Sequence, residues 1–300
     1  MVLLSPRNWP DYELIDSGNF EKLERFGAYI LARPEPKALW KKSLSEMEWN
    51  SMIHTRFVTE GGCPPVGRDD ATWRVVKKMS GQWQIEYRGD GFAFTMRLGL
   101  TAFKHVGLFP EQAPNWDYIY EVCSRLSDRA QRNPTKILNL FAYTGGASLA
   151  ARAAGAEVTH LDAVRQVVTW ARENMELSGL EGIRWIVEDA LKFVRRQKRR
   201  GTLYQGIILD PPAYGHGPEG ESWKLEDNLY ELLEGCNAIL APTESFVVLN
   251  LYSNGFSAVL ADTILRQAFG ATGAGTSGEL ILEDRFGKRL PLSVFARIER

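Results

Sequence analysis

Cysteine is scarce in this sequence of 300 residues, and long hydrophobic runs are absent. The three cysteines, Cys63, Cys123 and Cys236, are far apart and form no Cys-x-x-Cys pair. That spacing gives no support for a zinc site or a disulfide framework, and it is usual in a reducing compartment. No apolar stretch approaches the roughly 18 residues of a membrane span, and the N-terminus lacks the basic start and apolar core of a secretory signal. We therefore expect a cytoplasmic protein with no bound metal and no membrane contact.

An excess of positive charge is also lacking. Lys and Arg together number 36 against 37 Asp and Glu, for a net charge of −1, whereas a protein that holds nucleic acid mainly by neutralising phosphates is clearly basic. The dense basic run at residues 195–200 ends a predicted helix, where cations complement the helix dipole. We prefer that explanation to an RNA-binding patch, although a local basic surface is compatible with the composition.

The first third of the chain is predicted to be rich in β-strands. Two alternating runs, residues 84–87 and 92–98, flank the turn sequence Asp90-Gly91, which is typical of a hairpin. Further short strands are expected near residues 28–32, 52–58 and 72–77. Five of the nine tryptophans fall in this part, and we favour a small antiparallel core filled by them over a base-stacking platform. Residues 1–109 are expected to form a smaller β-rich domain with a role in substrate recognition.

From about Phe109 onward, strands and helices alternate. Apolar runs typical of buried strands are separated by segments with apolar residues at helical spacing. The expected strands are 136–141, 157–161, 183–187, 204–209 and 245–251, and the expected helices are 147–154, 163–178, 190–199, 224–240 and 256–269. Repeated strand–helix units build a parallel sheet with helices on both faces. Residues 110–300 are therefore predicted to form a doubly wound α/β domain.

The sequence ends on two predicted strands, residues 279–283 and 292–298, joined by a tight turn at residues 285–288. A parallel crossover needs about a dozen residues or more, so the last strand must run antiparallel. A nicotinamide-binding doubly wound domain normally keeps the corresponding strand parallel. The pattern predicts a closing antiparallel hairpin and argues against a dinucleotide-binding domain.

Ligands of such sheets bind at the carboxyl ends of the strands, and three strand ends carry suitable groups. The first strand runs into Thr144-Gly145-Gly146, where glycine permits a positive φ and the next helix can receive a carboxylate at its N-terminus. Asp162 follows the second strand and can accept hydrogen bonds from ribose hydroxyls. Asp189 follows the third and can accept one from an adenine amino group. Each carboxylate can instead cap the helix that follows it.

The most specific sequence is Asp210-Pro211-Pro212-Ala213-Tyr214, directly after an apolar strand. Proline fixes φ and has no N–H group, which leaves a rigid edge of carbonyl acceptors beside one carboxylate. Such an edge can hold an amino group or a planar base, and Tyr214 can stack on that base. The alternative is a plain turn, but at the end of the fourth strand we prefer a functional role.

Together these residues resemble class I S-adenosylmethionine-dependent methyltransferases, whose doubly wound sheet has seven strands and usually ends in an antiparallel hairpin. The chain is more closely similar to the family that holds the large-subunit ribosomal RNA cytosine-C5 and guanine-N7 methyltransferases. Residues 139–146, Asn-Leu-Phe-Ala-Tyr-Thr-Gly-Gly, match that family's first motif. Residues 104–112 resemble its segment that closes over the cofactor.

The resemblance implies an enzyme that binds S-adenosylmethionine and methylates a ribosomal RNA base. It implies that the catalytic loop consists of Asp210, Pro211, Pro212 and Tyr214. The implied cofactor-binding residues are Phe109, Gln112, Asn139, Phe141, Tyr143, Thr144, Gly145, Gly146, Asp162, Asp189 and Asp210.

Two departures from the family pattern bear on mechanism. Asn139 stands where many relatives have Asp. No cysteine lies within residues 210–217 or after Leu251, although RNA cytosine-C5 methylation needs a thiolate there. Cys236 falls in a leucine-rich predicted helix, where core packing is its expected role. We therefore expect direct displacement onto an acceptor such as nitrogen. The alternatives are a protein or small-molecule methyltransferase, or a non-catalytic S-adenosylmethionine-binding module, against which the Asp210 loop argues. The sequence leaves the oligomeric state open.

Overall fold

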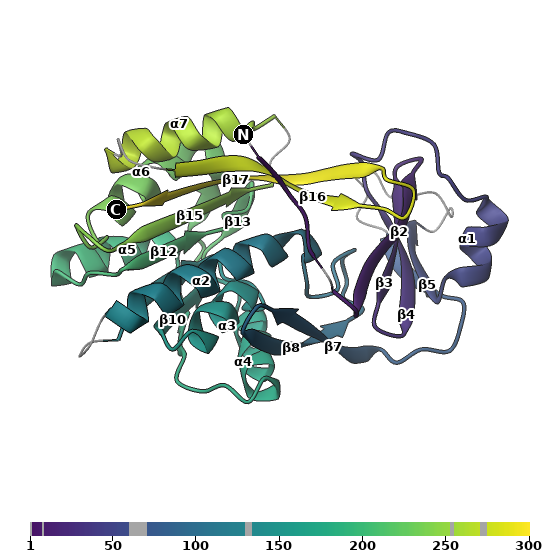
Figure 1. The fold of residues 1–300 in the computed structure, drawn as a ribbon, viewed down its shortest axis with the longest axis horizontal. Helices are drawn as coiled ribbons and strands as arrows, with labels where there is room; N and C mark the ends of the chain where they lie inside the picture. The colour runs from purple at the N-terminus through teal and green to yellow at the C-terminus, as the bar shows by residue number, and fades with distance from the viewer. Residues whose placement is uncertain (1, 8, 60–70, 130–133, 253–254, 271–274) are drawn as a thin grey trace.

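The computed structural model describes residues 2–7, 9–59, 71–129, 134–252, 255–270 and 275–300. Figure 1 shows two lobes side by side. One contains a large sheet with its helices, and the other contains a small sheet built from the N-terminal part of the chain. Cys63 lies outside the described residues.

The large sheet has eight strands. In spatial order they are β1 (Val2–Leu4), β16 (Gly275–Glu283), β17 (Arg289–Glu299), β15 (Phe246–Leu251), β12 (Gly206–Leu209), β9 (Lys136–Leu140), β10 (Glu157–Asp162) and β11 (Arg184–Val187). Strand β17 pairs antiparallel with both β15 and β16, while β15, β12, β9, β10 and β11 pair in parallel. The predicted doubly wound sheet and its closing hairpin are confirmed. The additional strand β1, which pairs in parallel with β16, was not among the seven expected.

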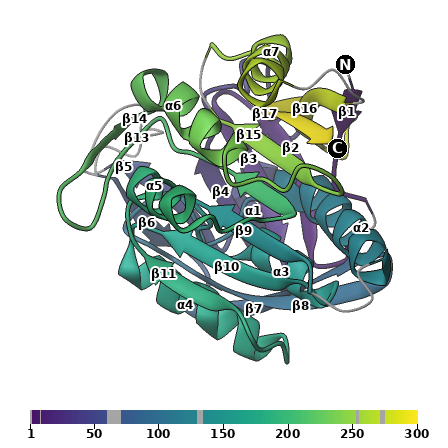
Figure 2. The same ribbon diagram turned by 90° about the vertical axis from the view of Figure 1, so that its left-hand side faces the viewer.

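In the described part of the chain, helices cover both faces of this sheet (Figures 1 and 2). They are α2 (Ala113–Arg129), α3 (Gly146–Ala153), α4 (Arg165–Leu177), α5 (Ala190–Arg200), α6 (Leu225–Asn237) and α7 (Ala258–Phe269), and a 3-10 turn at Pro110–Gln112 precedes α2. Alternate residues of one strand enter opposite cores: Ile208 of β12 packs with α2 and α3, whereas Ile207 and Leu209 pack with α5, α6 and α7. Because both faces of the sheet are covered, strands such as β12 and β15 are largely apolar along their whole length.

The small lobe is built on a five-stranded sheet. Its strands are β2 (Tyr12–Gly18), β3 (Glu21–Phe26), β4 (Tyr29–Pro34), β5 (Thr55–Thr59) and β6 (Ala71–Val75). The strand predicted at residues 52–58 is partly wrong, because Ser45 and Glu48 form a capping box that starts helix α1 (Glu46–Met52), and β5 begins only after it. Trp49 of α1 is fully buried under the sheet, which agrees with the core role expected for tryptophans.

The predicted hairpin around Asp90-Gly91 is confirmed as β7 (Gln82–Gly89) and β8 (Phe92–Gly99). It pairs with no strand of the five-stranded sheet and packs instead on α4. There the backbone N–H of Arg97 donates to Asn174 Oδ1 at 2.8 Å. The boundary between residues 1–109 and 110–300 stays a prediction, and β1 and this hairpin cross it.

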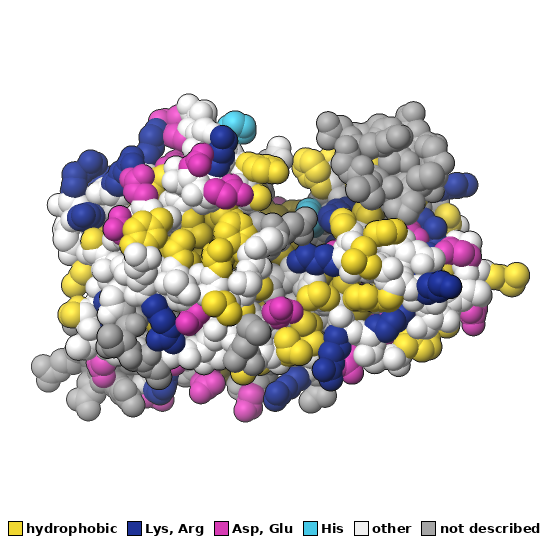
Figure 3. All heavy atoms as spheres, turned by 90° about the horizontal axis from the view of Figure 1, so that it is seen from above, with side chains coloured by type: hydrophobic (Ala, Val, Ile, Leu, Met, Phe, Trp, Pro, Cys, Tyr) yellow, Lys and Arg dark blue, Asp and Glu magenta, His cyan; other side chains and the backbone are white. Residues whose placement is uncertain are grey.

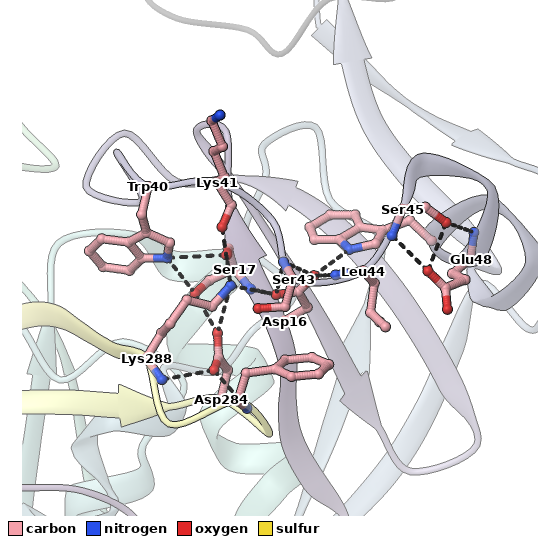
Figure 4. Close-up of polar contacts among 12 residues, drawn as sticks. Asp16, Ser17, Trp40, Lys41, Ser43, Leu44, Ser45, Glu48, Asp284 and Lys288 are labelled. Carbon is pink, nitrogen blue, oxygen red and sulfur yellow. Dashed lines mark hydrogen bonds and ion pairs between the residues drawn. The ribbon is translucent and has the colours of Figure 1, made fainter.

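A buried polar cluster joins the tip of the closing hairpin to the small lobe (Figure 4). Lys288 Nζ lies 2.7 Å from Asp16 Oδ1, and Ser17 Oγ donates to Asp284 Oδ2 at 2.8 Å. Asp16 also accepts hydrogen bonds from Trp49 Nε1 and from backbone N–H groups. Burial alone would raise the pKa of Asp16, but the hydrogen bond from Lys288 and these N–H donors lower it. The cluster holds the small lobe against the hairpin that ends the large sheet.

Candidate active site

A cavity of about 630 Å³ lies between the carboxyl ends of the parallel strands and the small lobe. Figure 3 shows the corresponding hollow between the two lobes. A smaller cavity of about 50 Å³ adjoins it at the loop after β9. Every residue that the sequence nominated lines one or both cavities. The larger one contacts Phe109, Phe141, Tyr143, Asp162, Asp189, Asp210, Pro211, Pro212 and Tyr214, and the smaller one contacts Phe109, Gln112, Asn139, Phe141, Tyr143, Thr144, Gly145, Gly146 and Asp210.

The loop after β9 holds strained backbone. Phe141 and Tyr143 have φ values of 55° and 49°, in the left-handed region that non-glycine residues rarely adopt. Such strain persists only where surrounding contacts fix it, and it gathers at functional sites. Gly145 (φ 96°) fits the expected use of glycine. Gly146 has a different reason, because a Cβ there would stand 2.7 Å from the Trp116 ring, so packing against α2 requires its small size.

Asp162 binds the strained loop directly. Its Oδ2 accepts from the Tyr143 N–H at 3.0 Å and its Oδ1 from the Val164 N–H at 2.9 Å. Burial raises the pKa of this carboxyl, while those backbone bonds act in the opposite direction. The helix-cap alternative is wrong for Asp162, because α4 is capped at Val164. The carboxylate therefore fixes the loop and lines the cavity.

Asp189 caps a helix and also lines the cavity. It is the N-cap of α5, with Oδ1 accepting from the Lys192 N–H at 2.9 Å. It also lines the larger cavity, beside Glu188. A capping carboxylate has acceptor sites beyond the one that the helix uses, so capping does not remove Asp189 from the site.

Asp210 heads a chain of polar side chains that crosses three strands. Its Oδ1 accepts from Asn250 Nδ2 at 2.7 Å, and Asn250 Oδ1 accepts from Ser293 Oγ at 3.0 Å. Asn250 belongs to β15 and Ser293 to β17, so the closing hairpin orients the carboxyl group. Burial raises the pKa of Asp210 to about 7, partly offset by the Asn250 hydrogen bond. The carboxyl can therefore change its charge near neutral pH.

The residues after Asp210 form a rim rather than a loose loop. Tyr214 and His216 lie on β13 (Tyr214–His216), which pairs antiparallel with β14 (Ser222–Lys224). The Tyr214 side chain is 78% exposed at the cavity mouth. Trp223 Nε1 donates to the Pro212 carbonyl at 2.7 Å, so this acceptor of the predicted edge is already engaged.

The segment at residues 104–112 packs against the loop after β9. Thr144 Oγ1 donates to the Gly107 carbonyl at 2.7 Å. The rings of Phe109 and Tyr143 lie 5.4 Å apart, and Gln112 Nε2 donates to Tyr252 Oη at 3.1 Å. These contacts place the segment over the junction of the two cavities.

The sequence did not predict several of the residues that line the cavities. Tyr252 follows β15 and could have been found by the strand-end rule that identified Asp210. Glu111 is 3% exposed, and its Oε2 has no hydrogen-bond partner among the described residues; burial raises its pKa. The small lobe adds Lys22, Arg33, Glu35 and Lys37, and Lys104 follows β8. No local pattern marks these charges, since the fold alone brings them to the cavity.

The thiols take no part in the described site. Cys123 and Cys236 are fully buried in the two cores and line neither cavity, and burial raises the pKa of both. The core role predicted for Cys236 is confirmed. Among the described residues, no group of three or more His, Cys, Asp or Glu side chains is placed to hold a metal ion. In the same part of the chain, no helix combines the length and apolarity needed to cross a membrane.

Comparison with known proteins identifies a family. A family model described as S-adenosylmethionine-dependent methyltransferase matches residues 77–266, more than half of the chain. The crystal structure of an S-adenosylmethionine-dependent methyltransferase from Agrobacterium tumefaciens is 39% identical, with a TM-score of 0.87, and the match covers 100% of this chain and 93% of that one.

Curated relatives include two kinds of ribosomal RNA enzyme. The ribosomal RNA large subunit methyltransferase K/L of Shewanella frigidimarina is 30% identical over 172 residues, covering 56% of this chain and 22% of the relative. The ribosomal RNA large subunit methyltransferase I of Klebsiella pneumoniae is 32% identical over 100 residues, covering 32% and 25%. The matched segments thus span about a quarter or less of these relatives.

Proposed function

This chain belongs to the S-adenosylmethionine-dependent methyltransferase family, and we propose that it methylates a base of large-subunit ribosomal RNA at a nitrogen atom. The relatives named as ribosomal RNA large subunit methyltransferases support the substrate class. Ribosomal RNA as substrate also implies the cytoplasmic location expected from the sequence. The site supports direct transfer, as the following residues indicate.

The donor set fits S-adenosylmethionine. Asp162 has acceptor capacity left for ribose hydroxyls and Asp189 for an adenine amino group. Asn139 and Thr144 line the smaller cavity, which suits the methionine moiety. When bound, the cofactor supplies an electrophilic methyl group. The protein then has only to bind, orient and exclude water around the acceptor.

Asp210 is the observation that carries the proposal of a nitrogen acceptor. Its carboxyl lies where the two cavities meet, and the Asn250–Ser293 chain fixes its direction. A carboxylate held in this way accepts a hydrogen bond from an amino or ring N–H and stabilises positive charge as it develops on that nitrogen. Since its pKa is about 7, it can also take up a proton near neutral pH.

The surroundings of Asp210 suit a base better than a thiol-dependent acceptor. The exposed ring of Tyr214 stands at the mouth of the cavity, where it can stack on an incoming base. Neither described cysteine lies in the cavity walls, so attack on a cytosine ring by a thiolate from Cys123 or Cys236 is not available. Direct transfer to nitrogen needs no protein nucleophile.

Nucleoside mass spectrometry tests the proposal. Ribosomal RNA from a strain that lacks the gene should lose one methylated nucleoside. Wild-type protein should restore it, and Asp210→Ala should not. An unchanged nucleoside profile, together with transfer of labelled methyl groups to a protein or small-molecule fraction, would contradict the RNA assignment and leave the methyltransferase activity intact.

A further inference from the structure

The small lobe presents a basic wall to the cavity that contains Asp210. Lys22 and Arg33 come from β3 and β4, Lys37 follows β4, and Lys104 follows β8. All four line the larger cavity, together with Asp210. Figure 3 shows Lys and Arg side chains gathered beside the hollow, on the side of the small lobe. Glu35 lies in the same lining, so these four cations face the cavity together with a carboxylate.

Two of these cations are already neutralised. Arg33 is 3% exposed and forms a close pair with Glu24, with Nη2 2.7 Å and Nε 2.8 Å from Oε2. Lys22 Nζ lies 3.5 Å from Glu24 and 3.7 Å from Glu35. These pairs satisfy the buried charges within the lobe, as buried ions require.

Among the described residues, Lys37 and Lys104 have only neutral hydrogen-bond partners, while the carboxylate of Glu35 attracts both ammonium groups at longer range. Lys37 Nζ donates to the Leu292 carbonyl at 2.8 Å, and Lys104 Nζ donates to the Pro34 carbonyl at 3.4 Å. Neither ammonium forms an ion pair with a carboxylate of the described residues, and burial lowers the pKa of both. An ammonium group withdrawn from water without a counter-ion is unfavourable. An anion entering the cavity would compensate both.

With the methionine moiety in the smaller cavity, as proposed above, the carboxylate of the cofactor would lie away from both lysines. The smaller cavity, which suits the methionine moiety, is lined by no Lys or Arg in the part of the chain that the structure describes. The ammonium groups of Lys37 and Lys104 stand instead in the larger cavity, which is also lined by Asp210 and Tyr214. The acceptor molecule is thus the source of the negative charge.

We propose that Lys37 and Lys104 form a phosphate subsite of the small lobe, which holds the backbone phosphate of the nucleotide whose base lies at Asp210. This inference rests on the proposed RNA substrate. A phosphate accompanies every nucleotide, and lysine binds it as a point charge through up to three donors. The subsite would fix the acceptor from the lobe opposite the methyltransferase sheet, so that substrate binding spans both lobes.

The test separates phosphate binding from RNA methylation. Inorganic phosphate, with sodium acetate as the carboxylate probe, is titrated at constant ionic strength into the protein saturated with S-adenosylhomocysteine. The proteins are wild type, Lys37→Met/Lys104→Met, and Lys37→Arg/Lys104→Arg, which keeps the charges. Lys41→Met is the matched control, because the Lys41 side chain is exposed and points away from its neighbours in Figure 4. S-adenosylhomocysteine affinity and thermal unfolding verify that each variant is folded.

The double Met variant should bind phosphate at least about tenfold more weakly, the loss expected for charge-assisted hydrogen bonds. The Arg variant and Lys41→Met should stay near wild type, and acetate should bind more weakly than phosphate. With ribosomal RNA, the double Met variant should raise KM about tenfold or more and leave kcat within about twofold. Equal phosphate affinity in the double variant and wild type, or tighter binding of acetate, refutes the subsite. Phosphate binding that depends on the lysines, without RNA methylation, supports the subsite and refutes the RNA substrate.

Discussion

Replacement of Asp210 by Asn separates the functional cost of this residue from its structural cost. Asn keeps the shape and the carbonyl oxygen that accepts from Asn250 Nδ2. It removes the negative charge and the ability to titrate, and it replaces the second carboxyl oxygen by an NH2 donor. The variant therefore tests whether the charged carboxylate of Asp210 lowers the stability of the folded protein while it raises the rate of methyl transfer.

The expected gain in stability follows from the pKa. Burial raises the pKa of Asp210 from 3.8 to about 7. The folded state therefore favours the protonated carboxyl, and the stability contribution of this group is complete below about pH 4 and is lost as the pH rises through 7. Each pKa unit corresponds to about 1.4 kcal/mol, so Asp210→Asn should stabilise the protein by up to about 4 kcal/mol above pH 8 and by little at pH 4.

The expected loss of function has the opposite sign. Asp210→Asn should lower the single-turnover transfer rate by about 10²–10³-fold, the scale observed when one preorganised electrostatic partner is removed. The wild-type rate should rise with pH through about 7 as the carboxyl ionises, and the variant should lack that rise. Affinity for S-adenosylhomocysteine should change little, because the interaction strengthens mainly in the transition state.

Urea unfolding between pH 4 and pH 8.5 measures the stability difference, and rapid-quench kinetics measure the rate on folded protein. Asp128→Asn, an exposed carboxylate on α2, is the control and should change neither. A variant that loses stability at every pH and keeps its turnover per folded molecule would show that Asp210 only supports the turn. That result would refute the catalytic assignment.

Further expectations concern the cofactor site, the rim, the thiols and the lobe junction. Asp162→Ala should weaken S-adenosylhomocysteine binding by about 1.5–3 kcal/mol in calorimetry, through loss of charged hydrogen bonds; NAD should not bind, and tight NAD binding without S-adenosylhomocysteine binding would overturn the assignment. Tyr214→Ala should raise KM and spare kcat, because stacking by an exposed ring is largely ground-state binding. A cysteine-free variant should keep methyl transfer per folded molecule, whereas a covalent adduct with a fluorinated cytosine substrate would disprove this. Lys288→Met should cost about 2–3 kcal/mol of unfolding free energy by leaving Asp16 and Asp284 without their cation; equal urea midpoints for variant and wild type would argue against that role.

The large sheet could be predicted from the sequence because its strands follow a simple rule. Both faces are covered, so apolar runs mark the strands, and the ligand-facing residues come directly after them. Asp162 and Asp210 were identified in this way. Tyr252 obeys the same rule after β15, but as a mainly apolar side chain it gives a weaker signal than a carboxylate.

The small lobe was harder to predict because its strands bury charges. In β2 and β3 the side chains of Asp16, Glu21, Lys22 and Glu24 are all buried, so the usual alternation of apolar and polar residues is lost. The cation that pairs with Asp16, Lys288, lies 272 residues away in the sequence. The three residues of β1 are too few to carry a periodic signal. Their partner, strand β16, lies near the other end of the sequence, so no local pattern indicates the pairing.

Strand β1 also constrains the order in which the protein can fold during its synthesis. Val2–Leu4 pairs with residues 278–280, and a Cβ on Gly278 would stand 1.9 Å from the Val2 carbonyl, so the two segments fit only at this spacing. A ribosome makes the first of these segments long before the second. The start of the chain must therefore wait without its sheet partner while nearly all the rest is translated, and contacts of such long sequence separation form slowly. The edge of the catalytic sheet can close only after the ribosome has released the closing hairpin, so residues 2–4 and this sheet complete their folding together.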